Sequence, residues 1–349
     1  MAEKFCVFCG QKPEKKNMEH VIPKWLSHYT GCYKMICALP GVTNRQIPFS
    51  EFKFPACTEC NSLYSELESD AGRVMVKILE SKSVNAAEIS VLLDWFDKVR
   101  VGLWLSELTL SHKIDDVAPK FHISQRIGMK DRLLIVERFK DCDSGLAFAG
   151  TANELFHHVP NAFQLMVNDY VFTNVSEYNL VSPKLGFPRA GKLPLANMYR
   201  DSVPVMRGTN KTAHPVIKGL DAAPERTILY QPMYRIFATM DDNNPYKSDY
   251  VQQHSLAPEA GIGGVFYQKG DNTIKYLESD KSVTLTPRAQ EHDNLATVHR
   301  KVFNMQQYMM NNLYDIPDSD PQVKAEIKRA LMQNYLYANS FAALNKKTK

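Results

Sequence analysis

The sequence contains no apolar run of the roughly 18 residues that a membrane-spanning helix needs. Its most apolar stretch, VGLWLSELTL from Val101 to Leu110, is interrupted by Glu107. The first residues, MAEKFCVFCG, also lack the basic-then-apolar order of a secretory signal. We therefore expect a cytoplasmic protein that has no membrane partner.

The sequence also lacks a strong excess of one charge, an internal repeat and a low-complexity tract. The net charge is only +4 over 349 residues, of which 44% are hydrophobic and 23% are charged. This balance is typical of a soluble globular protein, and it neither requires nor excludes a polyanionic partner. A chain of this length can bury a large core and is long enough for two domains.

Cysteine is scarce, with seven residues, and an odd number speaks against complete pairing in disulfides. In a reducing compartment, cysteines at short spacing favour metal binding over disulfides. Two matched pairs at this spacing would supply four thiolates to a structural zinc ion and would leave no position open for a substrate. The two pairs are Cys6-x-x-Cys9 and Cys57-x-x-Cys60.

Two alternatives to this zinc site remain open on the sequence alone. The four paired cysteines could instead be free thiols in a core, where cysteine is common. Cys32 and Cys37 are competing ligands, although their spacing and apolar neighbours suit core positions better. The matched spacing of the pairs favours zinc over both alternatives.

Polar residues that can transfer a proton or bind a metal ion lie near both cysteine pairs in the sequence. Glu19 and His20 fall between the pairs, in the stretch MEHVIPKWL, and Asn61 follows the last paired cysteine directly. A metal ion that joins the two pairs would bring Asn61 toward this stretch. An isolated Glu-His dipeptide is usually a solvated surface pair, and an Asn after a cysteine knuckle is often a helix N-cap.

The combination of CxxC, EHVIP and CxxCN resembles the HNH endonuclease family, whose ββα-metal module is stapled by zinc. The resemblance covers about residues 4–80. The motif is similar to that of a subgroup of bacterial HNH proteins, which carry Glu rather than Asp before the His. It implies that His20 is the general base and that Glu19 and Asn61 hold a divalent ion, Mg²⁺ or Mn²⁺. It also implies hydrolysis of phosphodiester bonds to a 5′-phosphate and a 3′-hydroxyl, with DNA expected before RNA as the substrate.

The sequence departs from the family at the middle Asn of the motif, where it reads PFSEFKFPAC. Asn44 is the nearest Asn, and Ser50 is an alternative that would hold the histidine loop. Glu68 lies two helical turns after Asn61 and so on the same helix face. It is a candidate for an additional metal ligand or for an ordinary solvated Glu.

The predicted fold class is α+β, with an HNH module in residues 1–82 and a larger mixed domain in 83–349. Within the larger domain, hydrophobic periodicity predicts a helix over 86–111. β-branched and aromatic runs predict a strand-rich region over 119–285, and helical periodicity returns over 287–345.

No motif assigns a role to residues 83–349. A regulatory partner or ligand, homo-oligomerisation and defence against foreign DNA are hypotheses that rest on analogy with the settings of HNH modules. The alternative to an endonuclease is a non-catalytic zinc module that binds nucleic acid or a protein partner.

Overall fold

The computed structural model describes residues 5–13, 17–37, 45–111, 130–142, 145–151, 161–177, 180–181, 184–185, 215–218, 220, 223–233, 263–271, 273–314 and 321–347. The expected α+β class is confirmed, because helices and sheets of several strands are mixed along the chain. Within these residues, every helix is too short or too polar to cross a membrane.

The N-terminal part is a set of short strands followed by a long helix. Strand β1 pairs antiparallel with β4, and β2 pairs antiparallel with β3. The segment Phe49–Glu51 forms a 3₁₀ turn before β4, and the helix that carries Asn61 and Glu68 begins at Thr58, three residues before Asn61. The elements are β1 (Met18–His20), α1 (Lys24–Thr30), β2 (Lys34–Cys37), β3 (Arg45–Pro48), η1 (Phe49–Glu51), β4 (Lys53–Pro55) and α2 (Thr58–Leu79).

The helix predicted over 86–111 is confirmed as α3 (Ala86–Leu110). It begins with a capping box in which the Asn85 side chain accepts from the Glu88 N–H at 2.9 Å and the Glu88 carboxylate accepts from the Asn85 N–H at 3.0 Å. Such reciprocal bonds satisfy two helix-terminal donors. The preceding residues form β5 (Ser83–Asn85), which pairs with β13 (Ser282–Thr284) near the other end of the chain.

The central region forms an eight-stranded sheet with the order β12-β11-β10-β6-β9-β8-β7, and β14 pairs in parallel with the end of β6. The other pairings are antiparallel. The strands are β6 (Asp131–Phe139), β7 (Leu146–Ala149), β8 (Ala162–Val167), β9 (Tyr170–Glu177), β10 (Arg226–Gln231), β11 (Phe266–Lys269), β12 (Lys275–Tyr276) and β14 (Ala289–Gln290).

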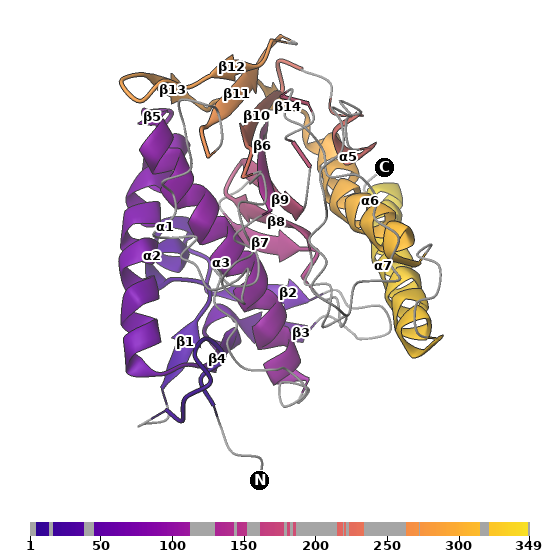
Figure 1. The fold of residues 1–349 in the computed structure, drawn as a ribbon. Coiled ribbons are helices and arrows are strands. Elements are labelled where there is room, and N and C mark those ends of the chain that lie inside the picture. The colour runs from indigo at the N-terminus through magenta and orange to yellow at the C-terminus, as the bar shows by residue number, and fades with distance from the viewer. Residues whose placement is uncertain are drawn as a thin grey trace, which may run out of the picture.

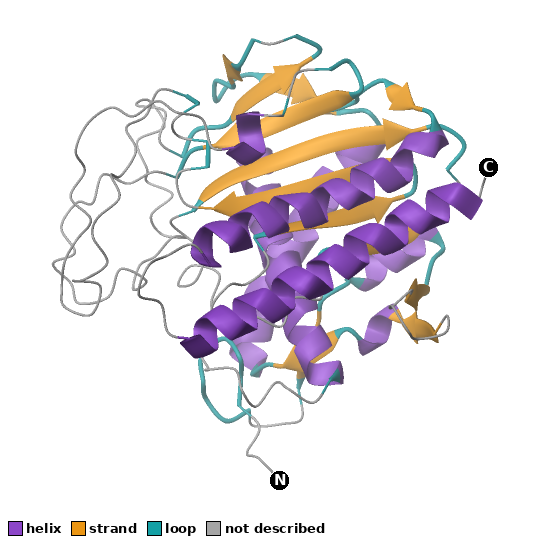
Figure 2. Ribbon diagram, turned by 90° about the vertical axis from the view of Figure 1, so that its right-hand side faces the viewer, coloured by secondary structure: helices purple, strands orange, loops and turns teal. Residues whose placement is uncertain are grey.

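The sheet lies between two helical layers (Figure 1). Helices α6 (Leu295–Tyr314) and α7 (Pro321–Lys347) lie antiparallel across one face, as Figure 2 shows, and α3 lies on the other. Alternation along β6 explains how the sheet packs against helices on both faces, because successive side chains point to opposite faces. Leu134 and Val136 join the core beside α3, whereas Leu133 and Ile135 join the core beneath α6 and α7.

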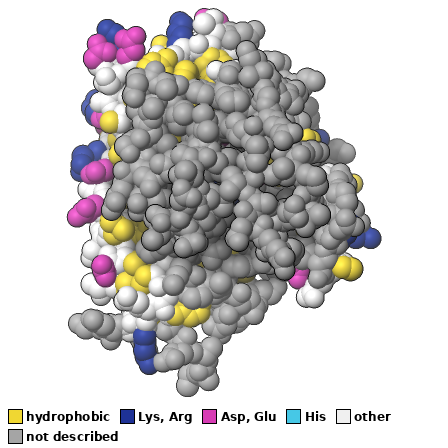
Figure 3. Space-filling view, viewed as in Figure 1, with side chains coloured by type: hydrophobic (Ala, Val, Ile, Leu, Met, Phe, Trp, Pro, Cys, Tyr) yellow, Lys and Arg dark blue, Asp and Glu magenta, His cyan; other side chains and the backbone are white. Residues whose placement is uncertain are grey.

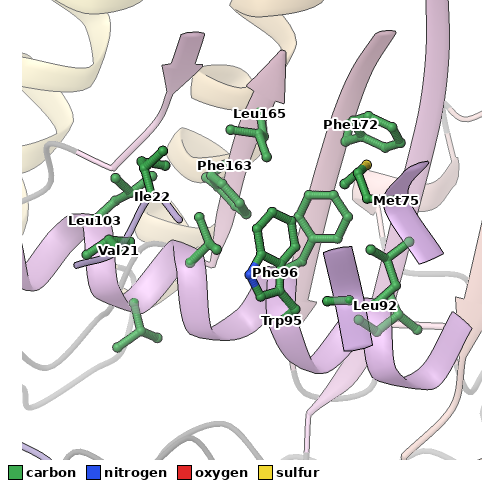
Figure 4. Packing of buried hydrophobic residues seen from close by; sticks show 14 of the residues in the cluster. Val21, Ile22, Met75, Leu92, Trp95, Phe96, Leu103, Phe163, Leu165 and Phe172 are labelled. Carbon is green, nitrogen blue, oxygen red and sulfur yellow. The ribbon is translucent and has the colours of Figure 1, made fainter. Parts of the chain in front are cut away.

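Helix α3 also packs against the antiparallel pair β1–β4, whose strands are separated in the chain by α1, β2 and β3 and which we call the histidine hairpin. One hydrophobic core therefore runs from the paired cysteines to the sheet. Figure 4 shows Val21 and Ile22 of the N-terminal part near Leu103 of α3, with Phe163 of β8 beyond. Gly102 permits this approach, because a Cβ there would lie 2.9 Å from Val21 Cγ1 and 3.3 Å from Phe54 Cε1. Residues of the predicted module 1–82 therefore share a core with α3.

The outer surface of α2 carries charges of both signs. In Figure 3, basic and acidic side chains are mixed along the left edge, where α2 lies in Figure 1. Arg73 pairs with Asp70, and Lys82 pairs with Glu80 at 2.6 Å. This part of the surface is therefore not a polycationic strip of the kind that binds a phosphate backbone.

Candidate metal centre and histidine hairpin

The first cysteine pair lies on a tight turn that directs both sulfurs to one side. The Gly10 N–H donates to the Cys6 carbonyl at 2.8 Å, and Gly10 has a φ of 78°, which a residue with a side chain rarely adopts. The turn is fixed to the hairpin because the Val7 N–H donates to the Pro55 carbonyl at 3.1 Å. Strand β4 therefore connects this pair to the second one.

The second pair forms the start of α2. Cys57 is the N-cap residue, and its sulfur accepts from the Cys60 N–H at 3.5 Å. Burial raises the pKa of the Cys60 thiol. For Cys57, burial acts in the same direction but is outweighed by hydrogen bonds from the Cys60 backbone and from neighbouring thiols, so its pKa is lowered. A helix N-terminus is a favourable place for a thiolate, since its N–H groups point toward the sulfur.

The four sulfurs form a cluster of the size that a tetrahedral metal ion requires. All four Sγ atoms lie within 4.8 Å of one another, and those of Cys9 and Cys57 are 3.7 Å apart. A zinc ion with Zn–S bonds of about 2.3 Å gives an S···S edge of roughly 3.8 Å, whereas a disulfide bond is only about 2.05 Å long. The predicted four-cysteine site is thus positioned to hold a metal ion, and its size suits zinc.

The competing ligands behave differently. The Cys32 thiol donates to the Lys34 carbonyl at 3.4 Å and does not belong to the cluster of four sulfurs. The side chain of Cys37 lies outside the residues that the structure describes.

The β1–β4 register places Glu19 and His20 on opposite faces of the hairpin. Glu19 is paired with Phe54, and both are buried toward α3. His20 is paired with Lys53 on the other face and is exposed. The two residues are consecutive in the chain, and alternation along a strand therefore separates their side chains.

Partial desolvation lowers the pKa of the His20 imidazole from its ordinary value, and the positive charge of Lys53 adds to this shift. Glu19 and Glu51 act in the opposite direction, while Lys24 acts in the same direction as Lys53. An exposed imidazole with a lowered pKa is neutral at pH 7 and can accept a proton.

Asn61 lies in the first turn of α2, and its nearest polar side-chain partner in the described structure is Asn17. The Asn61 Nδ2 atom donates to the Asn17 Oδ1 atom at 3.4 Å, and the Asn17 carbonyl accepts from the Ala56 N–H at 3.3 Å. Sequence reasoning missed Asn17, although it precedes His20 by only three residues. It sought the middle Asn near the second pair, where Asn44 lies outside the described residues and Ser50 is exposed in η1.

Glu19 and Glu68 meet at a third residue, Lys98 of α3. The Lys98 ammonium forms ion pairs with both carboxylates. Only 1% of the Lys98 side chain is exposed, compared with 4% for Glu19 and 18% for Glu68. Burial raises the pKa of Glu68, although the Lys98 charge opposes that shift. No local sequence pattern indicates Lys98 as their partner.

The hairpin thus brings Glu19, His20 and Asn61 to one region, but their side chains have different partners. Asn17 joins the start of β1 to the start of α2, so His20 is within about 10 Å of this junction along the strand. Glu19 contacts α3 instead, through Lys98.

Comparisons of the chain with protein families, with curated proteins and with solved structures find no significant match. The fold and the site define an α+β protein in which four cysteines are positioned to hold a metal ion beside a histidine-bearing hairpin.

Proposed function

We propose that the protein is a metal-dependent endonuclease of the HNH kind that hydrolyses phosphodiester bonds, with DNA as the preferred substrate. The single observation that carries this proposal is the order β1, β4, α2 around the four-cysteine cluster, which presents His20 on an exposed hairpin face and Asn61 in the first turn of the helix. The resemblance of EHVIP and CxxCN to the HNH family supports the same activity.

His20 is the general base in this proposal. A neutral imidazole takes a proton from a water molecule as the water attacks phosphorus. The lowered pKa of His20 supports this role, because the ring is then in its basic form at neutral pH. Lys53, its cross-strand neighbour, supplies a positive charge on the same face for a phosphate oxygen.

Asn61 would offer its Oδ1 atom to a divalent ion, Mg²⁺ or Mn²⁺, because its hydrogen bond to Asn17 uses Nδ2. Such an ion neutralises charge on the scissile phosphate and on the leaving oxygen when it is bound. Glu19, the other ligand predicted from the sequence, has its carboxylate in the ion pair with Lys98. The four-cysteine site would hold zinc in a structural role, since four protein ligands leave no open position.

The test is cleavage of supercoiled plasmid by the purified, zinc-loaded full chain in Mg²⁺ or Mn²⁺. We expect metal-dependent nicking that His20→Ala abolishes. His28→Ala is the matched control, because His28 lies on α1 and contacts Tyr33 rather than the hairpin face. Zinc content is measured for each sample, so that loss of activity on chelation can be separated from loss of the structural ion. Equal activity of the wild type and His20→Ala would refute the proposal.

A second candidate is a non-catalytic zinc module that binds nucleic acid or a protein partner. The observation in its favour is that the Glu19 carboxylate is occupied by Lys98. This candidate predicts that the wild type retains DNA without cutting it under any divalent ion and that His20→Ala retains DNA equally well.

We further propose that residues 83–349 gate the nuclease, in a setting such as defence against foreign DNA. The argument is that an unregulated nuclease endangers its own cell, and it rests on analogy. Constitutive cleavage by the purified wild-type protein would count against gating.

A further inference from the structure

The most unusual charged group near the hairpin is Lys98. It directly follows the buried Asp97, which pairs with Arg100, and its ammonium reaches two carboxylates on two other elements, β1 and α2. Burial of an ammonium is unfavourable unless anions surround it, and a hydrophobic side chain would serve packing as well. The position therefore calls for a reason beyond packing.

The charges around Lys98 do not balance when all three groups are ionised. Two carboxylates, Glu19 and Glu68, face one ammonium, so the cluster would carry one excess negative charge. One buried and one half-buried carboxylate around a cation supply the hard-oxygen donors that a divalent ion prefers. In this structure the cation between them is the lysine side chain.

We infer that Lys98 acts as a tethered cation that occupies the place of a divalent ion between Glu19 and Glu68. Glu19 is then not a ligand of the catalytic ion, but a positioning residue that fixes β1 to α3. The ammonium is covalently part of α3, so this cation cannot be removed by chelators.

The contact has a consequence for His20, and this step rests on the proposed function. Glu19 immediately precedes His20, and the Lys98 ion pairs connect β1, α2 and α3 at this point. The direction of the His20 side chain therefore depends on a residue of the long central helix. Lys98 is in this sense a positioning residue for the general base.

The test measures Mn²⁺ binding to the zinc-loaded full chain without nucleic acid. Binding is monitored by the loss of the free Mn²⁺ signal in electron paramagnetic resonance. Thiolates favour Zn²⁺ over Mn²⁺, so the cysteine site does not interfere. The variants are Glu19→Gln, Lys98→Ala and the double variant. We expect Glu19→Gln to leave Mn²⁺ binding unchanged. Lys98→Ala should gain an additional Mn²⁺ site, which the double variant loses.

Two results would overturn the inference. One is weaker Mn²⁺ binding by Glu19→Gln while Lys98 is present, because Glu19 would then be a ligand beside the lysine. The other is a folded Lys98→Ala that gains no site. Zinc content and near-ultraviolet circular dichroism establish whether each variant folds. If Lys98→Ala does not fold, Mn²⁺ binding by the wild type and by Glu19→Gln still decides whether Glu19 is a ligand. Neither readout uses cleavage, so failure of the nuclease proposal leaves this test intact.

A separate measurement tests the positioning role. Lys98→Arg keeps the positive charge, and Lys98→Met keeps most of the length without the charge. We expect Lys98→Met to lower kcat for plasmid cleavage with KM little changed, and Lys98→Arg to restore part of kcat. Equal kcat in wild type and a folded Lys98→Met would refute this role.

Discussion

His20 and Lys53 are direct cross-strand partners in the β1–β4 hairpin, so their side chains lie on the same exposed face. Paired residues in an antiparallel ladder have Cβ atoms about 5 Å apart. The effect of the Lys53 charge on the pKa of His20 is one consequence of this proximity. A second is that a phosphate brought to His20 would come near the Lys53 ammonium, which forms an ion pair with Glu51 at 3.5 Å.

Lys53→Met should therefore weaken binding of nucleic acid across all sequences. If Lys53 contacts one phosphate, the slope of log affinity against log salt should fall in magnitude by about 1. The measurement is DNA retention by fluorescence anisotropy between low and moderate salt. Lys82→Met is the control, since Lys82 follows the end of α2 and pairs with Glu80. An unchanged slope in Lys53→Met would show that this lysine makes no phosphate contact.

Cys60→Ser should abolish zinc retention and destabilise the N-terminal part of the chain. A hydroxyl is a poor substitute for a thiolate, and zinc binding contributes directly to folding where ligands come from separate segments. Cys32→Ser is the matched control, because its sulfur contacts the Lys34 carbonyl outside the cluster. Zinc content per chain and thermal unfolding with and without added zinc are the readouts. Equal zinc content in the two variants would exclude Cys60 as a ligand.

The sequence was informative wherever spacing or periodicity was local. The x-x spacing of the two cysteine pairs predicted a cluster that the structure confirms. Apolar periodicity placed α3 to within one residue of its observed end. Within the region predicted to be strand-rich, the run from Phe163 to Val175 forms two strands that turn at Asn168, whose φ is 52°.

Contacts between distant segments could not be predicted in this way. Glu19 and Lys98 are 79 positions apart, and nothing local marks a lysine within an apolar helix as the partner of a carboxylate on a strand. Asn17 was missed for a related reason, since its side chain meets Asn61 only because the cysteine cluster brings β1 beside α2. Likewise, β5 pairs with β13, which lies some 200 residues away, and local periodicity carries no signal of this pairing.

Gly102→Ala should displace the histidine hairpin from α3. The added methyl group would lie 2.9 Å from Val21 Cγ1, closer than real contacts allow. Overpacking of this kind costs about 1 to 3 kcal/mol, which exceeds the gain of roughly 1 kcal/mol from replacing a helical glycine. We expect lower stability in urea and, under the proposed function, lower cleavage. Gly102→Ala combined with Val21→Ala should recover part of the loss, and a stabilised Gly102→Ala would contradict the tight approach.

Glu107 of α3 should make the protein less stable as the pH rises. Glu107 as a residue is half-buried, but its Oε2 atom is buried without a hydrogen-bond partner in the described structure, and its Oε1 atom accepts from Thr151 at 2.9 Å. Burial raises the pKa of this carboxyl to about 8 from an ordinary value of 4.5. The folded state thus keeps a proton that the unfolded chain releases, and stability falls from about pH 4.5 up to pH 8.

The experiment compares urea unfolding of the wild type and Glu107→Gln at pH 6 and pH 9. The amide resembles the protonated carboxyl and does not titrate, so it removes this source of pH dependence. Between pH 6 and pH 9, the free energy of unfolding of the wild type should fall by about 2 to 3 kcal/mol more than that of Glu107→Gln. Comparing the two proteins cancels the pH dependence of the cysteine cluster, which both retain. Parallel losses would mean that the Glu107 carboxylate is already ionised in the folded protein at pH 6.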